Sequence, residues 1–262
     1  MTKLINLQNR AILEVKGDDR KKFLQGLITN DINKASETNL IYSAMLSAQG
    51  RFLYDFFIFE IGEKLILDCS AVRRDEILQK LNFYKLRSKV SLKKNDELKI
   101  FYNQDGQGFQ DPRHAKLGFR LYSSDQNLSA NSAESEYNFN RISLKIPEGE
   151  TDLTHDKSFI LEFGFDDLNA IDYQKGCYVG QELTARTHYR GEIRKKILHV
   201  KILDQILPEK NSEIACEGKS VGIILSAVSH ENAIHALALV KDLQEIDFKN
   251  LELASQKILV IN

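Results

Sequence analysis

Cysteine is scarce in this sequence. Its 262 residues include three cysteines, Cys69, Cys177 and Cys216, and no tryptophan. The cysteines are odd in number and widely separated, which excludes a disulfide framework and a Cys-x-x-Cys metal knuckle and fits a reducing compartment. If a metal is bound, this chain alone supplies too few thiolates to hold it.

Net charge and long apolar runs are also lacking. The 36 basic and 37 acidic residues leave a formal net charge of -1, so no overall field draws the chain toward nucleic acid or an anionic membrane. No run of about 18 apolar residues is present. The first residues are too polar for the apolar core of a signal peptide. We therefore expect a soluble, cytoplasmic protein with no nucleic-acid partner and no membrane partner.

The remaining composition is that of an ordinary globular protein. Apolar residues make up 42% of the chain and charged residues 28%, which is enough for a sizeable core. Residues 10–15 predict a short strand, and two aspartates then precede a helical repeat at residues 21–28. Apolar segments separated by turns predict three antiparallel strands at residues 39–46, 52–60 and 65–69.

The middle of the chain alternates between the two patterns. Residues 71–86 predict a helix. Its apolar stripe consists of Val72, Ile77, Leu78, Leu81 and Tyr84. Residues 88–102 predict a hairpin that turns at Asn95-Asp96. The polar residues 123–136 predict a surface loop or linker, and the short apolar runs after residue 196 predict a small β-barrel or sandwich of about seventy residues. Strands outnumber helices and mostly neighbour one another, which favours an α+β fold.

Cys177 lies in the segment KGCYVGQE, residues 175–182. It has three interpretations: a small buried hydrophobe, a nucleophile or a metal ligand. Gly176 and Gly180 lack a Cβ, so they let the chain turn into a helix or let another backbone or a ligand approach closely. If residues 178–187 form a helix, Cys177 lies at its N-terminus, where the dipole favours a thiolate. No local signature of a cysteine hydrolase accompanies it.

A basic stretch, ARTHYRGEIRKK, follows at residues 185–196. It contains five basic residues and one acidic residue, a pattern most typical of a solvated face. Alternatively, guanidinium groups beside Tyr178 and Tyr189 would clamp a planar ligand with a carboxylate tail, through stacking and paired hydrogen bonds. Both interpretations stay open on spacing alone.

The segment KGCYVGQELTARTHYRG resembles the signature of the YgfZ family, the folate-binding relatives of the glycine-cleavage T-protein, whose mitochondrial members act in iron–sulfur protein maturation. Further segments look like the landmarks of that family, in the same order. They are residues 23–32, 48–59, 84–90, 111–120, 146–149 and 159–168. The resemblance covers essentially the whole chain.

The resemblance implies a T-protein-like architecture, in which subdomains surround a central channel and a β-barrel follows. Residues 1–190 are expected to form a folate-binding α+β region of two interleaved subdomains, and residues 191–262 the C-terminal β-barrel. Tetrahydrofolate or a derivative is expected in the channel, with its pterin amide edge against a carboxylate and its glutamate tail against basic residues.

The resemblance also implies contacts for that folate. By motif position, Asp55 resembles the T-protein aspartate associated with the folate, and Glu162 resembles the pterin-binding glutamate. Alternatively, Asp55 is an exposed strand residue and Glu162 is one of the eight acidic residues of a solvated loop at residues 148–172. The other implied contacts are Lys175, Gly176, Tyr178, Gly180, Gln181, Glu182, Arg186 and Arg190.

One departure separates this chain from T-proteins. Cys177-Tyr178 stands where aminomethyltransferases usually carry an aromatic residue, and Tyr54-Asp55 replaces their paired acids. The leading hypothesis is therefore a tetrahydrofolate-binding accessory factor for assembly or repair of iron–sulfur proteins. Cys177 would be its essential, solvent-reachable thiolate and a ligand of a transient cluster shared with a partner. Cys69 and Cys216, on predicted strands, are expected to be core residues.

The implied partners are A-type iron–sulfur carrier proteins and client iron–sulfur enzymes, such as the radical enzymes that methylthiolate tRNA. Two alternatives stay open. One is a folate-dependent aminomethyl or one-carbon transferase, in which Asp55 positions or deprotonates the folate nitrogen. The other is a binding module that keeps the folate site but performs no chemistry.

Overall fold

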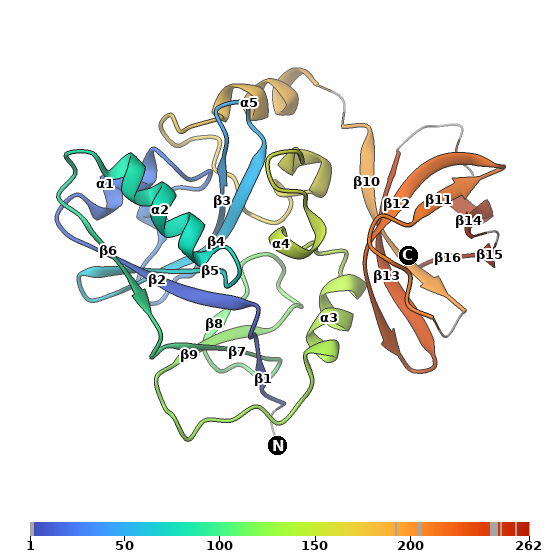
Figure 1. Ribbon diagram of the computed structural model, residues 1–262, viewed down its shortest axis with the longest axis horizontal. Coiled ribbons are helices and arrows are strands. Elements are labelled where there is room, and N and C mark those ends of the chain that lie inside the picture. The colour runs from blue at the N-terminus through green and yellow to red at the C-terminus, as the bar shows by residue number, and fades with distance from the viewer. Residues whose placement is uncertain are drawn as a thin grey trace.

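The computed structural model contains three β-sheets with helices packed against them (Figure 1). The structure describes residues 3–191, 193–203, 206–241, 246, 248–254 and 256–261. Within these residues no helix has the length and apolar character needed to cross a membrane.

The first sheet has five antiparallel strands in the order β3-β4-β5-β2-β6. They are β2 (Arg10–Lys16), β3 (Ile41–Leu46), β4 (Phe52–Ile61), β5 (Lys64–Ser70) and β6 (Ser91–Asn95). Successive residues of a strand point to opposite faces. Leu65 and Leu67 of β5 therefore pack in one core and Ile66 in another. The strands predicted at residues 10–15, 39–46, 52–60 and 65–69 are confirmed to within two residues.

Two helices, α1 (Arg20–Gln25) and α2 (Arg74–Lys85), lie against one face of this sheet, and η1 (Ile32–Lys34) is a short 3-10 turn that contacts α1. Buried residues of both helices, including Leu24 and Ile77, share a core with the sheet. The predicted apolar stripe of α2 is too long at its start. The helix begins at Arg74, and Val72 precedes it with 82% of its surface exposed.

The second sheet has four strands in the order β1-β7-β9-β8. They are β1 (Ile5–Asn6), β7 (Lys99–Asn103), β8 (Phe109–Gln110) and β9 (Phe119–Ser123). The hairpin predicted at residues 88–102 is wrong, because β6 pairs with β2 and β7 pairs with β1 and β9. A bend at Asn95 does occur: its Oδ1 accepts hydrogen bonds from the backbone N–H of Glu97 and Leu98, both at 2.9 Å. The chain crosses there from one sheet to the next instead of folding back on itself.

Four short helices connect these sheets to the last one. They are α3 (Glu134–Ser143), α4 (Gly149–Asp152), the 3-10 helix η2 (Ile160–Phe163) and α5 (Gln181–Arg190). The loop predicted at residues 123–136 is irregular over residues 124–133 and is too long at both ends, because Ser123 ends β9 and Glu134 begins α3. Helix α3 packs against β12 and β13 of the C-terminal sheet.

The C-terminal sheet has seven strands in the order β15-β14-β11-β12-β13-β10-β16 and curls into a nearly closed, barrel-like form (Figure 1, orange to red). Its elements are β10 (Lys195–Ile202), β11 (Glu213–Cys216), β12 (Lys219–His230), β13 (Ala233–Lys241), η3 (Phe248–Asn250), β14 (Leu251–Leu253), β15 (Gln256–Lys257) and β16 (Leu259–Ile261). Cys69 on β5 and Cys216 on β11 are buried core residues, as predicted. The expected domain boundary between residues 190 and 191 stays a prediction.

Candidate functional site

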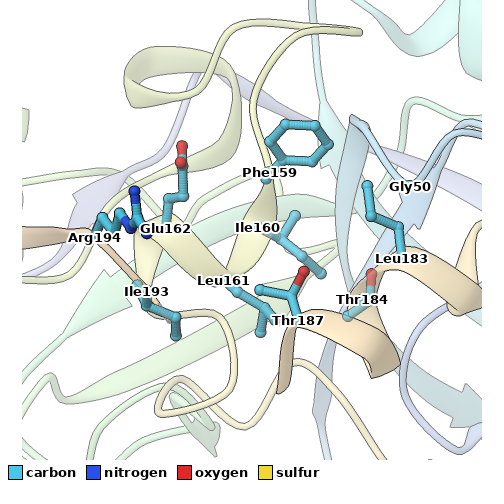
Figure 2. A pocket seen from close by; sticks show the side chains of 10 residues that line it. All are labelled: Gly50, Phe159, Ile160, Leu161, Glu162, Leu183, Thr184, Thr187, Ile193 and Arg194. Atoms are coloured by element: carbon cyan, nitrogen blue, oxygen red, sulfur yellow. The ribbon is translucent and has the colours of Figure 1, made fainter. Parts of the chain in front are cut away.

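A cavity of about 230 Å³ lies between η2 and the helix α5. Its lining residues are Gly50, Phe159, Ile160, Leu161, Glu162, Leu183, Thr184, Thr187, Ile193 and Arg194. Figure 2 shows apolar side chains along most of the wall, with the charged groups of Glu162 and Arg194 together on one side. An apolar wall with few polar groups suits a flat ligand that is polar along one edge.

A second cavity, of about 350 Å³, shares Leu161, Glu162 and Ile193 with the first. The basic residues of its lining are Arg113, His114, Lys145, Lys195 and Lys196. The Nη1 of Arg113 is buried and has no hydrogen-bond partner within the described residues. A buried donor without a partner is costly, so a ligand oxygen or a water at this point would be stabilised.

Glu162 belongs to both cavities. The 3-10 helix η2 carries it, and the Nζ of Lys195 donates a hydrogen bond to its Oε2 at 2.9 Å. Its side chain keeps 29% of its surface exposed, so the carboxylate is not sealed off by that ion pair. Glu162 is therefore more than one acid of a solvated loop, because it lies on the wall of two cavities.

Cys177 is exposed, as the hypothesis of a reachable thiol requires. The predicted helix at residues 178–187, however, begins later. Helix α5 starts at Gln181 with Gly180 as its N-cap, so Cys177 lies in the irregular segment that precedes the helix. A helix dipole acts mainly within its first turn. The condition on which the dipole argument depended, a helix that begins at residue 178, is therefore not met.

Lys175 fixes the segment that carries Cys177. Its Nζ donates hydrogen bonds to the backbone oxygens of Gln25, Ile28 and Asn30, at 2.8, 2.6 and 2.9 Å. Burial lowers the pKa of Lys175 to about 8, against the opposing effect of nearby carboxylates. The three acceptors lie at the end of α1 and in the segment that follows it, so Lys175 holds the chain in place two residues before the thiol.

Tyr178 and Gln181 lie at the start of α5 and are joined by a hydrogen bond. Tyr178 is 8% exposed and belongs to the main hydrophobic core, and its ring lies 5.0 Å from the Nζ of Lys175. The backbone N–H of Tyr178 donates to the Oε1 of Gln181 at 3.3 Å. Neither side chain lines the two cavities.

Of the two glycines, Gly180 permits a close approach of backbones. Its φ is +82°, and a Cβ there would lie 2.4 Å from the backbone oxygen of Ser47, in the turn between β3 and β4. Gly176 has open space where its Cβ would be. The expected turn into a helix and the close approach of another backbone are therefore confirmed at Gly180. At Gly176 the Cβ position meets no backbone among the residues that the structure describes.

The exposed face of α5 carries the remaining signature residues. Glu182, Arg186 and Arg190 are exposed and line neither cavity. The basic residues that do reach the cavities are Arg194, Lys195 and Lys196, further along the same basic stretch, together with Arg113, His114 and Lys145. The sequence contained a signal for Arg113, because Arg113 lies in the landmark segment at residues 111–120. The spacing of residues in that segment gave Arg113 no role.

Asp55 lies elsewhere, on β4, and is 1% exposed. Its carboxylate accepts two hydrogen bonds from the Nη1 of Arg10, at 3.0 and 3.1 Å, and one from the hydroxyl of Tyr42 at 3.2 Å. A Cβ on Gly149 would lie 2.6 Å from this carboxylate, so the backbone of α4 closes over it. The interpretation of Asp55 as an exposed strand residue is wrong, and neither cavity reaches it.

Arg10 and Asp55 belong to a buried ionic cluster that joins the first two sheets. Asp68 accepts hydrogen bonds from Arg10 at 2.6 Å and from Arg120 at 3.0 Å. Arg120 also donates to Asp111 at 3.0 Å. Burial opposes the ionised form of Asp111, but the guanidinium groups around it outweigh burial and hold its pKa at about 2. The members of the cluster bind one another and tie β2, β4 and β5 of the first sheet to β9 of the second.

The fold resembles that of a glycine-cleavage enzyme. The crystal structure of the glycine cleavage system aminomethyltransferase T from Bartonella henselae superposes with a TM-score of 0.71, covering 98% of this chain and 83% of that one at 12% identity. At this identity the likeness concerns the fold alone. The expected T-protein-like α+β fold, with a barrel-like sheet at its C-terminal end, is confirmed.

No family model matches the chain. Curated proteins do match it, under the name iron-sulfur cluster assembly factor IBA57, mitochondrial, or its homolog. The Neurospora crassa protein is 34% identical over 230 residues, which are 74% of this chain and 52% of that protein. The human protein is 30% identical over 236 residues, 76% of this chain and 66% of that protein. The chain belongs to the YgfZ and IBA57 family. It spans about half to two thirds of the length of these family members.

Membership of the YgfZ and IBA57 family confirms the resemblance seen in the motifs. It also corrects one expectation, that of a cytoplasmic protein, because the matching IBA57 proteins are named as mitochondrial. That expectation came from composition and charge, which do not report the compartment. The folate contacts expected of the family, and the essential role of Cys177, stay predictions.

Proposed function

We propose that this chain is an assembly or repair factor for iron–sulfur proteins and that it presents Cys177 to a cluster-carrying partner. The observation that carries the proposal is the exposed thiol on a segment fixed by Lys175. The names of the curated relatives, iron-sulfur cluster assembly factors, support the same role. The partners are A-type cluster carriers and client enzymes such as the radical enzymes that methylthiolate tRNA.

The chemistry of Cys177 needs no helix dipole. When a thiol binds iron, its sulfur forms the Fe–S bond and its proton passes to solvent, so the metal itself produces the thiolate. An iron–sulfur cluster normally has four protein ligands. Cys177 therefore acts as one ligand of a cluster whose other ligands belong to the partner, and the cluster is cargo rather than a resident cofactor.

Tetrahydrofolate or a derivative is proposed to bind in the two cavities that meet at Glu162. The residues present fit this group: Glu162 would accept hydrogen bonds from the pterin amide edge, and the basic residues Arg113, Lys145, Lys195 and Lys196, which line the second cavity together with Asp166 and Asp167, would attract the anionic tail. A reduced folate supplies reducing capacity that protects a nearby cluster from oxidation. The chain's own residues bind it, orient it and shield it from water.

The alternative of a folate-dependent aminomethyl transferase gains no support from the position of Asp55. Its carboxylate is engaged by Arg10 and Tyr42 and lies outside both cavities. Turnover of a folate adduct by the purified protein, lost in Asp55→Asn, would restore that alternative.

Methylthiolation of tRNA, measured by mass spectrometry in cells that lack this gene, tests the proposed function. The wild-type chain should restore the modification, and Cys177→Ala should not. Cys216→Ala is the matched control and should restore it, because that cysteine is buried in the C-terminal sheet. A maleimide should label Cys177 and leave Cys69 and Cys216 unlabelled in the folded protein, since only Cys177 is exposed.

Two results would overturn the proposal. Methylthiolation that persists in the deletion strain would remove the link to iron–sulfur clients. Full rescue by Cys177→Ala would show that the thiol is dispensable and would favour a binding module without chemistry.

A further inference from the structure

The end of α2 presents two large apolar side chains to solvent. Phe83 is 76% exposed and Leu86 is 86% exposed. The inner face of the same helix is already complete, because Ile77 and Leu81 are fully buried against the sheet. Phe83 and Leu86 therefore add nothing to the core, and neighbouring apolar side chains of this size on a surface often mark an interaction site.

The backbone at Leu86 is strained. Its φ is 44° and its ψ is −112°, values that turns normally give to glycine. The backbone oxygen of Lys85 accepts a hydrogen bond from the N–H of Ser88 at 2.8 Å, which closes this turn. A leucine here strains the backbone and gains no burial. Strain that local packing does not explain is found mainly at functional positions.

Along the chain, the residues on either side of Phe83 and Leu86 carry charge of one sign, and the nearest acid that contacts them is Asp19, which binds the backbone of Lys89. Residues 77–95 contain six basic residues and no acidic residue. Lys94 is paired with Asp75. The following side chains form no ion pair within the part of the chain that the structure describes: Lys80, Lys85, Arg87 and Lys89. In a chain of net charge -1, this concentration of positive charge is local.

We propose that Phe83 and Leu86, together with Lys80, Lys85, Arg87 and Lys89, form a docking surface, here called the α2 turn surface. Its occupant is a partner protein with an apolar pocket edged by carboxylates. Aromatic and arginine side chains are typical anchors of protein interfaces, and the surrounding cations select an acidic rim. A nucleic acid would use the cations and leave the exposed leucine without a role.

The α2 turn surface and Cys177 are linked through α1. The backbone N–H of Lys89 donates to the carboxylate of Asp19, at the start of α1, at 2.7 Å. Lys175 binds the backbone oxygen of Gln25 at the other end of α1. This helix has six residues and is therefore about 9 Å long. A protein docked on the α2 turn surface would be within reach of the segment that carries Cys177. The inference rests on the function proposed above and deepens it, because it names where the cluster-carrying partner binds.

Binding of a purified A-type cluster carrier, measured by isothermal titration calorimetry with the full chain, tests this surface. Phe83→Ala combined with Leu86→Gly should weaken binding at least tenfold. Leu86→Gly alone should also raise the melting temperature, because glycine adopts the turn without strain, so lost binding would not reflect unfolding. Arg87→Glu should slow association and reduce its dependence on salt. Val72→Ala is the matched control: it removes an exposed apolar side chain before the other end of α2 and should leave the affinity unchanged.

Unchanged carrier affinity in the double variant, or no carrier binding by the wild-type chain, would overturn the docking surface. The docking surface would also be overturned if Phe83 and Leu86 were needed for binding to bulk tRNA or to vesicles of anionic phospholipid but not for binding to the carrier. The proposed function is judged separately. Cys177→Ala should bind the carrier with wild-type affinity and fail in the rescue of methylthiolation. If it binds normally and also rescues, the surface stands and the proposed function fails.

Discussion

Lys175 and Cys177 are two residues apart in the chain, and their surroundings differ completely. The ammonium group of Lys175 is held by three backbone oxygens, whereas the thiol of Cys177 is exposed. Asp55 and Glu162 differ in a similar way: Arg10 and Tyr42 engage the first carboxylate, and two cavities border the second. At the scale of single residues, what a side chain can do chemically depends on which of its polar atoms are already bound.

Glu162→Gln should weaken tetrahydrofolate binding about 10- to 100-fold, because the hydrogen bonds of a carboxylate to a pterin edge are worth roughly 1.5–3 kcal/mol. The fold should be little affected, since the Lys195 partner is partly exposed and such pairs contribute little. Calorimetric titration of both proteins with the reduced folate measures the effect.

Glu213→Gln is the control for this measurement, because it removes an exposed carboxylate on β11 that borders neither cavity at Glu162. Equal folate affinity in Glu162→Gln and the wild type would contradict the assignment of the pterin edge to this carboxylate.

At the scale of elements, the start of α5 determines how the segment that carries Cys177, residues 175–180, packs on the first sheet. Gly180 is the N-cap of the helix, and its backbone packs on the turn between β3 and β4. The backbone N–H of Val179 donates to the oxygen of Gly26 at 3.1 Å, so the same segment is also tied to α1. These backbone contacts place Cys177 beside α1 without any contribution from its own side chain.

Gly180→Ala should lower the free energy of unfolding by about 3 kcal/mol, because the new Cβ strains the backbone at φ +82° and meets the backbone oxygen of Ser47 at 2.4 Å. Gly176→Ala, four residues earlier, should change it by less than about 0.5 kcal/mol, since its Cβ position is open. Urea denaturation of the two variants compares them directly. Equal stabilities would show that α5 does not require glycine at its N-cap.

At the scale of the whole molecule, buried polar groups connect the layers. The ionic cluster around Arg120 joins the first two sheets, and Arg141 of α3 donates to Ser226 of β12 at 3.2 Å across to the C-terminal sheet. Inside that sheet, the Nε2 of His199 lies 2.8 Å from the Nδ1 of His235. Burial, with smaller effects of His235 and Lys145, lowers the pKa of His199 to about 4.

Folding stability should therefore fall as the pH drops from 6.5 to 4. In that window the unfolded chain binds a proton at His199 that the folded chain does not, and one such group contributes a slope of at most about 1.4 kcal/mol per pH unit. In His199→Gln the loss of stability across this window should be smaller, by about 2 kcal/mol. Urea denaturation at a series of pH values measures it. His188→Gln, which removes an exposed histidine, is the control variant, and an unchanged slope in His199→Gln would contradict the assignment.

Local patterns in the chain were enough to predict the α+β class, four of the five strands of the first sheet, the buried positions of Cys69 and Cys216 and the family, because alternation, helical period and motif are local in the chain. The folded chain, by contrast, separates β6 and β7 into two sheets, encloses Asp55 against Arg10 and places Glu162 at the border of two cavities, and no local pattern predicted this. Arg10 is 45 residues from Asp55, and Lys195 is 33 residues from Glu162. Such partners meet through the pairing and packing of whole elements, which no local pattern of residues specifies.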